Sequence, residues 1–181
     1  MKLEEAKQIL KNNGYLLEDS FDDEPITVDH IDHYNYLKYI GKFVNVTNNV
    51  NLIELGLTEL PIKFGTVGGN FDCGFNKLTS LKGAPNIVSG IFACDYNKLT
   101  TLEGSPKKVG GEFNCVGNKL TSLEGAPIKV GENFYCHHNN LTSLEGSPKE
   151  VGGDFSCHSN KKKFTVSDVS EVSKVYGEIW V

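Results

Sequence analysis

A repeat with a period of 21 residues runs through most of this chain. Five cysteines recur at that interval, and each is followed three residues later by an asparagine. A period between about 20 and 50 residues is typical of a solenoid, in which each unit buries its apolar side by stacking on its neighbours. We therefore predict a repeat protein whose function depends on positions that differ between the copies. The pairs are Cys73 and Asn76, Cys94 and Asn97, Cys115 and Asn118, Cys136 and Asn139, and Cys157 and Asn160.

Each copy follows the pattern FxCxxNxLTSLEGxPxxVG. Because side chains two residues apart point to the same face of a strand, Phe and Cys are predicted to point inward together. The asparagine comes where the strand ends, and its amide can bond the buried turn and the next coil. Glycine and proline in the second half predict a corner and an extended return segment. The inward aromatic positions are Phe71, Phe92, Phe113, Phe134 and Phe155.

The pattern resembles the leucine-rich repeat, LxxLxLxxNxLxxL, with Phe, Cys and Asn at its fourth, sixth and ninth positions. Residues 57–67 (LTELPIKFGTV) look like the short bacterial subtype. The strings VGGxFxCxxN and LTSLEGAP are similar to leucine-rich-repeat-like proteins common in large tailed bacteriophages. The resemblance covers about residues 43–181. It implies an α/β solenoid, a right-handed superhelix of short parallel strands around a concave sheet, with a helix-poor convex side. The first strand position, usually Leu, is mostly Gly here, so the inner edge of each coil is expected to differ from the family pattern.

The ends of the chain are predicted to cap the solenoid, because an uncapped end exposes apolar core and an unpaired strand edge. We expect a small α-helical cap over 1–42, a strand hairpin and degenerate first repeat over 43–66, repeats over 67–160, and a C-terminal cap over 161–181. Within the first cap, 2–13 and 29–40 have the apolar spacing of helices, the second beginning at Asp29.

Two further expectations concern register. FVNV and VNLI, joined at Asn48 and Asn49, are predicted to form the hairpin, with Val50 and Leu52 taking the Phe and Cys positions. At the other end, Val172 and Tyr176 are expected at the Val and Phe positions, with Glu178 replacing Cys and KVYGEIWV as the closing strand.

Composition favours a cytoplasmic protein, in the host cytoplasm if a phage encodes it. No stretch approaches the roughly 18 consecutive apolar residues of a membrane span, and MKLEEAKQIL lacks the apolar segment of a signal peptide. The cysteines are interpreted as small buried side chains. Zinc binding and disulfides are the alternatives, but a linear ladder does not surround a metal, and a cytosol keeps thiols reduced.

Charge argues against nucleic acid as a partner. The net charge is -5, and all 18 basic residues are lysine, whereas phosphate and base recognition depend on arginine and clustered positive charge. Lys161, Lys162 and Lys163 form a basic run, which we interpret as a solvated loop. No cofactor, metal site or catalytic residue is predicted. The nearest arrangement to an acid-base or metal cluster is His30 and His33 beside Asp29 and Asp32, which we interpret as a polar helix face.

Function is expected on the outward strand positions that alternate with Phe and Cys, where the copies vary. Neutral divergence of a solvated surface is one interpretation. The other is a protein-binding surface, because Tyr buries a large area at low entropic cost. We expect Phe75 and Tyr96 to form an aromatic pair and the tyrosine and histidines of the last two coils to cluster. The candidate partner-binding residues are Phe75, Tyr96, Asn114, Tyr135, His137, His138 and His158.

Three functional hypotheses follow. The first is a non-catalytic binding module, a phage accessory protein that engages a host or phage protein, for example as an inhibitor of host defence. The second is a virion or assembly component that oligomerises. The third is an enzyme using His30 and His33 or the histidines of the sheet, which could alternatively bind a metal. The sequence leaves the partner and the oligomeric state open.

Overall fold

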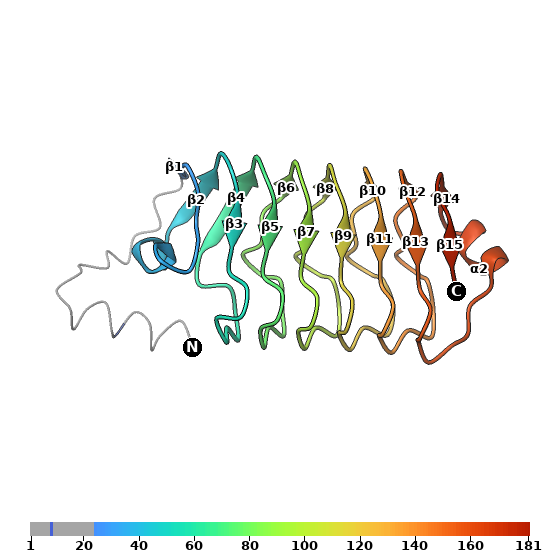
Figure 1. Ribbon diagram of the computed structural model, residues 1–181. Helices are drawn as coiled ribbons and strands as arrows, with labels where there is room; N and C mark the ends of the chain where they lie inside the picture. Colours follow the sequence, from blue (N-terminus) through green and yellow to red (C-terminus); the bar gives the residue numbers. More distant parts are fainter. Residues whose placement is uncertain (1–7, 9–23) are drawn as a thin grey trace.

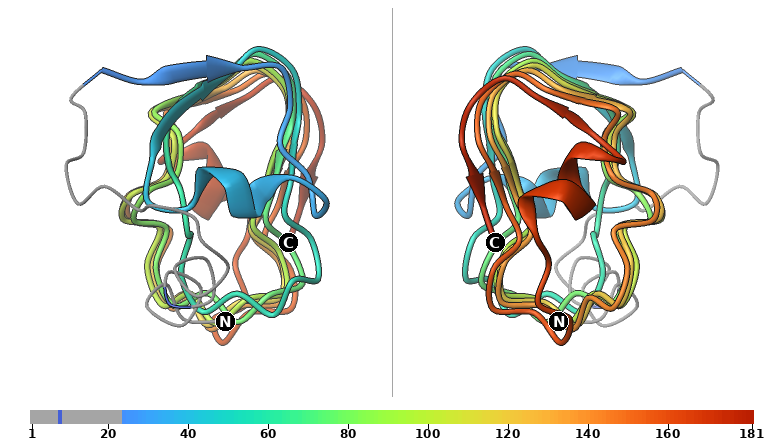
Figure 2. Two further views of the ribbon diagram at one scale, coloured as in Figure 1. Left: turned by 90° about the vertical axis from the view of Figure 1, so that its left-hand side faces the viewer. Right: turned by 90° about the vertical axis from the view of Figure 1, so that its right-hand side faces the viewer.

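The computed structural model describes residue 8 and residues 24–181. This part of the chain winds into a parallel β-solenoid whose coils lie side by side along one axis (Figure 1). Each full repeat contributes two short strands, which belong to two different sheets. Viewed along the axis, the sheets form two neighbouring sides of the coil (Figure 2).

The first sheet has eight strands in the described part of the chain, in the order β1-β2-β4-β6-β8-β10-β12-β14, and the second has seven, in the order β15-β13-β11-β9-β7-β5-β3. The first consists of β1 (Ile26–Val28), β2 (Phe43–Val46), β4 (Lys63–Val67), β6 (Ile87–Val88), β8 (Lys108–Val109), β10 (Lys129–Val130), β12 (Glu150–Val151) and β14 (Lys174–Val175). The second consists of β3 (Val50–Asn51), β5 (Phe71–Asp72), β7 (Phe92–Ala93), β9 (Phe113–Asn114), β11 (Phe134–Tyr135), β13 (Phe155–Ser156) and β15 (Ile179–Trp180). Within residues 24–181, the short helices η1 (Tyr36–Tyr39) and α2 (Val166–Ser170) accompany them.

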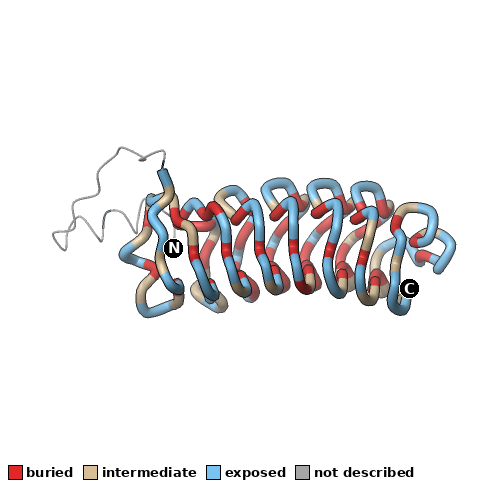
Figure 3. Tube along the Cα trace, turned by 90° about the horizontal axis from the view of Figure 1, so that it is seen from above, coloured by how far each residue is buried: buried red, intermediate tan, exposed pale blue. Residues whose placement is uncertain are grey.

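The core is a set of ladders that run along the solenoid axis, as the repeat predicts. Buried and exposed segments alternate around every coil (Figure 3). The repeat phenylalanines stack on one another with ring centroids 5.2 to 5.4 Å apart. The five cysteines are buried and unpaired. Because each ring and thiol packs on its copy in the next coil, the apolar interior is continuous.

The asparagine ladder joins each coil to its neighbours. The side-chain oxygen of Asn118 accepts from the Leu99 amide at 3.0 Å. Its nitrogen donates to the carbonyls of Cys94, Cys115 and Val116 at 3.0 to 3.3 Å. The equivalent bonds recur at the other asparagines. The buried turn therefore has the hydrogen-bond partners that the sequence pattern predicts for it.

The parallel strands and the scarcity of helix confirm the solenoid prediction, but the interior differs from a coil with one sheet. The valine near the end of each repeat lies in a second strand of the coil, such as β6 or β8, and this strand pairs with its equivalents in the neighbouring coils. These strands make the first sheet. The leucine-rich-repeat pattern assigns one strand to each coil and does not account for this second row.

Two predictions for the amino-terminal region are wrong. Residues 29–40 do not form one helix, because Ile31 pairs in parallel with Val50 and is buried as an extra rung of the core. The Asp32 carboxylate accepts from the amides of Tyr34 and Asn35 at 2.9 and 3.1 Å and turns the chain, and η1 follows. The hairpin is also absent, since β2 and β3 belong to different sheets. The helix expected over 2–13 lies outside the described residues.

The predicted register at the carboxyl end is wrong by three residues. Val175 pairs with Val151, and Ile179 pairs with Phe155. Helix α2 is the cause, because it lengthens this coil. Thr165 begins the helix with a capping box, in which its hydroxyl accepts from the Asp168 amide. KVYGEIWV is therefore two strands, β14 and β15, joined at a corner.

Candidate interaction surface

The outward residues of the second sheet form a continuous surface, which we call the sheet face. It consists of the residues directly before and after each Phe position, and the third and fourth residues after it. Every residue proposed from the sequence as partner-binding lies in these four rows. The rows are Asn49, Asn70, Ile91, Glu112, Asn133, Asp154 and Glu178; Asn51, Asp72, Ala93, Asn114, Tyr135, Ser156 and Trp180; Ile53, Gly74, Asp95, Val116, His137 and His158; and Glu54, Phe75, Tyr96, Gly117, His138 and Ser159.

Phe75 and Tyr96 form an exposed aromatic stack. Their ring centroids are 4.6 Å apart at an interplanar angle of 26°. The side chains are 47% and 49% exposed, so the stack presents a flat apolar surface to solvent. Gly117 continues the row, and a Cβ there would lie 2.8 Å from the Tyr96 ring. The ring therefore extends over the space that this glycine leaves.

The same turn position has a left-handed backbone in every repeat. The φ angle is 52° at Phe75, 48° at Tyr96 and 54° at His138. Glycine adopts this conformation freely, whereas other residues incur a cost of about 1–2 kcal/mol. Only Gly117 in this row avoids that cost. Strained positions that carry exposed aromatic rings are typical of functional surfaces.

A histidine cluster occupies the fourth and fifth repeats, close to Tyr135. The rings of His137 and His158 stack with centroids 4.4 Å apart, and His138 approaches both edge-on, at 5.2 and 5.4 Å. The Tyr135 ring is 6.0 Å from His137. Burial, together with the charges of His158 and His138, lowers the pKa of His137 to about 4. Its Nδ1 is buried without a hydrogen-bond partner. Because its pKa is lowered, the ring is neutral at pH 7.

The remaining predicted site residue, Asn114, has a local structural role. Its side-chain oxygen accepts from the Val116 amide at 3.1 Å. Asp72 makes the same bond to Gly74 at 2.9 Å, and Asn51 makes it to Ile53 at 3.2 Å. The side chains directly after the Phe position therefore stabilise the turn on which Phe75, Tyr96 and His138 lie.

Sequence reasoning missed that the row before Phe also stabilises the solenoid. The side-chain oxygens of Asn49, Asn70 and Asn133 accept from backbone amides of the next coil at 2.8 to 2.9 Å. Asp154 does the same for Glu178 at 2.8 Å. Recurrent Asn or Asp at one corner position is the sequence signal that could have indicated this.

His30 and His33, which the sequence offered as an acid-base or metal cluster only as the alternative to a polar helix face, have different neighbours. His30 contacts the Asp29 carboxylate at 2.9 Å on the surface, and this hydrogen bond raises the pKa of His30. His33 instead contacts the ring of Tyr34. Among the described residues, no group of three or more His, Cys, Asp or Glu side chains is arranged to hold a metal ion. Burial raises the pKa of the Cys115 thiol, as it does for the other cysteines, so the thiols remain protonated.

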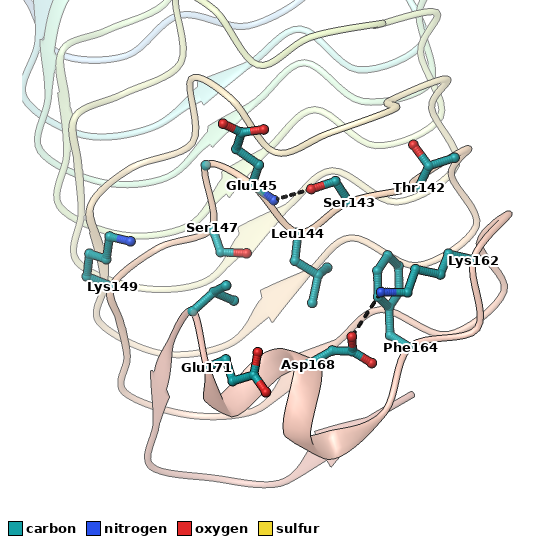
Figure 4. Close-up of a pocket in the computed structure, with 12 residues that line it drawn as sticks. Thr142, Ser143, Leu144, Glu145, Ser147, Lys149, Lys162, Phe164, Asp168 and Glu171 are labelled. Carbon is teal, nitrogen blue, oxygen red and sulfur yellow. Dashed lines mark hydrogen bonds and ion pairs between the residues drawn. The ribbon is translucent and has the colours of Figure 1, made fainter.

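A pocket of about 420 Å³ lies between the fourth repeat and α2 (Figure 4). Its lining includes Ser147, Lys149 and Phe164, and Lys162 pairs with Asp168 across one side at 2.9 Å. In the second repeat, Ser105 donates to a carbonyl of the next coil at 2.6 Å. The equivalent Ser147 hydroxyl is buried without a partner, because α2 replaces that part of the next coil. No residue predicted from the sequence to be functional lies in this pocket.

Comparisons with protein-family models, with curated proteins and with solved structures find no match. In the described part of the chain, no helix combines the length and the apolar character required to traverse a bilayer. The repeat and the geometry of the coils thus show a solenoid with two parallel sheets.

Proposed function

We propose that this protein is a non-catalytic module that binds another protein through the sheet face. The observation that carries the proposal is the exposed stack of Phe75 and Tyr96, which the chain maintains at left-handed turn positions where glycine would be more stable. Large exposed aromatic side chains near the centre of a surface are typical anchors of protein interfaces. Tyr135 and the histidine cluster extend the same surface over the neighbouring coils.

The resemblance to leucine-rich-repeat-like phage proteins suggests the setting. We propose an accessory protein that acts in the cytoplasm of an infected cell on a host or phage protein, for example as an inhibitor of a defence system. A catalytic role has less support, because the carboxylates of Asp29, Asp72 and Asp168 are engaged in local hydrogen bonds.

The test is a comparison of two double variants. Tyr96→Ala with Tyr135→Ala removes rings from the sheet face without changing the charge. Ile128→Ala with Tyr176→Ala removes side chains that are 72% and 58% exposed elsewhere, and serves as the matched control. With each protein immobilised and host lysate as the source of partners, we expect the first variant to bind the captured protein at least about tenfold more weakly, as for the loss of interface anchors. Equal binding by both variants, with unchanged melting temperatures, would reject the proposal.

A further inference from the structure

The sheet face differs in charge from the rest of the repeat region. Residues 67–181 contain 12 acidic residues and 12 lysines, yet the four rows of the sheet face contain no lysine. The carboxylates on the face are Glu54, Asp72, Asp95, Glu112, Asp154 and Glu178. An interface of this kind favours a partner of opposite charge, because complementary potentials guide association and exclude wrong partners.

Two of these carboxylates converge on one point beside the aromatic stack. A Cβ built on Gly74 would lie 2.8 Å from an Asp95 oxygen and 3.2 Å from an Asp72 oxygen. Glycine therefore leaves a small space that both side chains border. Phe75 and Tyr96 directly follow Gly74 and Asp95 in the chain, so the backbone that carries the aromatic stack adjoins this space.

Asp95 lacks a compensating cation. It is 9% exposed, and within the described residues no lysine or histidine nitrogen lies within 4.0 Å of its carboxylate. Burial raises the pKa of Asp95, a hydrogen bond from its own backbone amide partly offsets this rise, and the charge of Asp72 adds to it. The net rise shows that this negative charge opposes folding. A partly desolvated carboxylate without a cationic partner is costly, and a cation that entered from outside would remove part of that cost.

We infer that the partner presents an arginine or lysine side chain whose cationic group sits between Asp72 and Asp95 and lies against the rings of Phe75 and Tyr96. The inference rests on the proposed function and specifies the chemistry of its partner. A cation over an aromatic face is attracted by the negative charge of the ring face, and a carboxylate adds a charge-assisted hydrogen bond. A guanidinium satisfies both contacts because it is flat and carries donors along its edge. A divalent metal fits less well, since it requires more oxygen ligands than these two carboxylates supply.

The charge of both aspartates can be removed with little change of shape. Asp72→Asn retains the oxygen that accepts from the Gly74 amide, and the chain already uses Asn114 and Asn51 for that bond. Asp95→Asn removes a charge that opposes folding, so the double variant is expected to be at least as stable as the wild type. Glu103→Gln with Glu124→Gln is the matched control, because it removes two exposed charges from a different corner of the coils.

The direct probe is an oligo-arginine peptide with blocked ends, titrated calorimetrically against each protein at physiological ionic strength. We expect binding at least about tenfold weaker for Asp72→Asn with Asp95→Asn, and likewise for Phe75→Ala with Tyr96→Ala, which retains every charge. The Glu103 and Glu124 control should bind as the wild type does. If the Glu103 and Glu124 control weakens peptide binding as much as the Asp72 and Asp95 variant does, the peptide responds only to the overall negative charge, and the inference is overturned. Peptide binding that is unchanged by Phe75→Ala with Tyr96→Ala would also overturn it.

The same variants separate the inference from the function on which it rests. If Tyr96→Ala with Tyr135→Ala abolishes capture of the partner while Asp72→Asn with Asp95→Asn leaves it intact, the sheet face binds a protein but the cationic contact is wrong. A calcium titration without peptide provides a further arm. Saturable calcium binding that Asp72→Asn with Asp95→Asn abolishes would identify a metal site and overturn the inference.

Discussion

His137 lies where burial and two neighbouring imidazoles oppose its protonation. Its pKa falls to about 4, whereas the unfolded side chain titrates near the usual value of about 6.5. As the pH falls below about 6.5, the unfolded chain binds a proton that the folded protein does not. Stability is therefore lost between about pH 6.5 and pH 4, and the loss levels off below the lower value.

We predict that acidification from pH 7 to pH 4.5 destabilises the wild type by about 1–2 kcal/mol through this residue, after allowance for its partial exposure. His137→Gln should remove that component. His33→Gln, at an exposed position in the amino-terminal coil, should retain it. Urea unfolding of the three proteins at both pH values measures the difference. The same pH dependence in His137→Gln and wild type would show that the cluster does not oppose protonation.

The asparagine ladder is the element that the sequence predicted most completely. Each interior asparagine is buried and satisfies one amide and three carbonyls of two coils. Asn118→Ala should therefore cost about 3 kcal/mol or more, because buried backbone groups lose their partners. Asn160 makes an equivalent set of bonds but is only partly buried at the end of the ladder. Asn160→Ala should cost clearly less, since water can replace those bonds. Chemical denaturation would contradict this explanation if the two losses were equal.

Sequence reasoning succeeded where the period is regular and failed where it changes. Phe, Cys and Asn recur with one spacing, so their inward direction could be derived from strand geometry. Ile31 precedes its strand partner Val50 by 19 residues, and Ile179 follows its strand partner Phe155 by 24 residues. A register fixed at the repeat period therefore misplaces both of these residues. The apolar residues over 29–40 have the spacing of a helix, but this local preference is weaker than the burial of Ile31 in the core beside Val50.

The candidate surface was predictable in its rows but not in its local chemistry. The aromatic pair and the histidine cluster follow from equal positions in adjacent coils, so their proximity could be foreseen. The approach of Asp72 and Asp95 over Gly74 could not, because it links two different rows and depends on side-chain directions. The period of the repeat predicts the row in which a residue lies. Side-chain packing determines which residue of another row it approaches.

The chain as a whole behaves as a stack in which each coil contacts its nearest neighbours. Removal of one complete period, residues 98–118, joins Asn97 to Lys119 and preserves the register of every ladder. We predict that this shorter protein folds and that its remaining cysteines resist thiol reagents until it is denatured. Removal of 98–119 takes one residue more, shortens the turn after the asparagine and should leave a much less stable protein with reactive thiols. Equal thiol protection in both would show that the register does not depend on the period.

Hydroxyl-radical footprinting of the protein bound to its captured partner tests most directly whether the sheet face is the interface. In the free protein, the exposed rings of Phe75, Tyr96 and His138 should oxidise readily, together with Tyr34 and Ile128, which are exposed elsewhere. We predict that the partner protects Phe75, Tyr96 and His138 several-fold and leaves Tyr34 and Ile128 as reactive as before. Protection of Tyr34 or Ile128, with the sheet face still oxidised, would contradict the proposed interface.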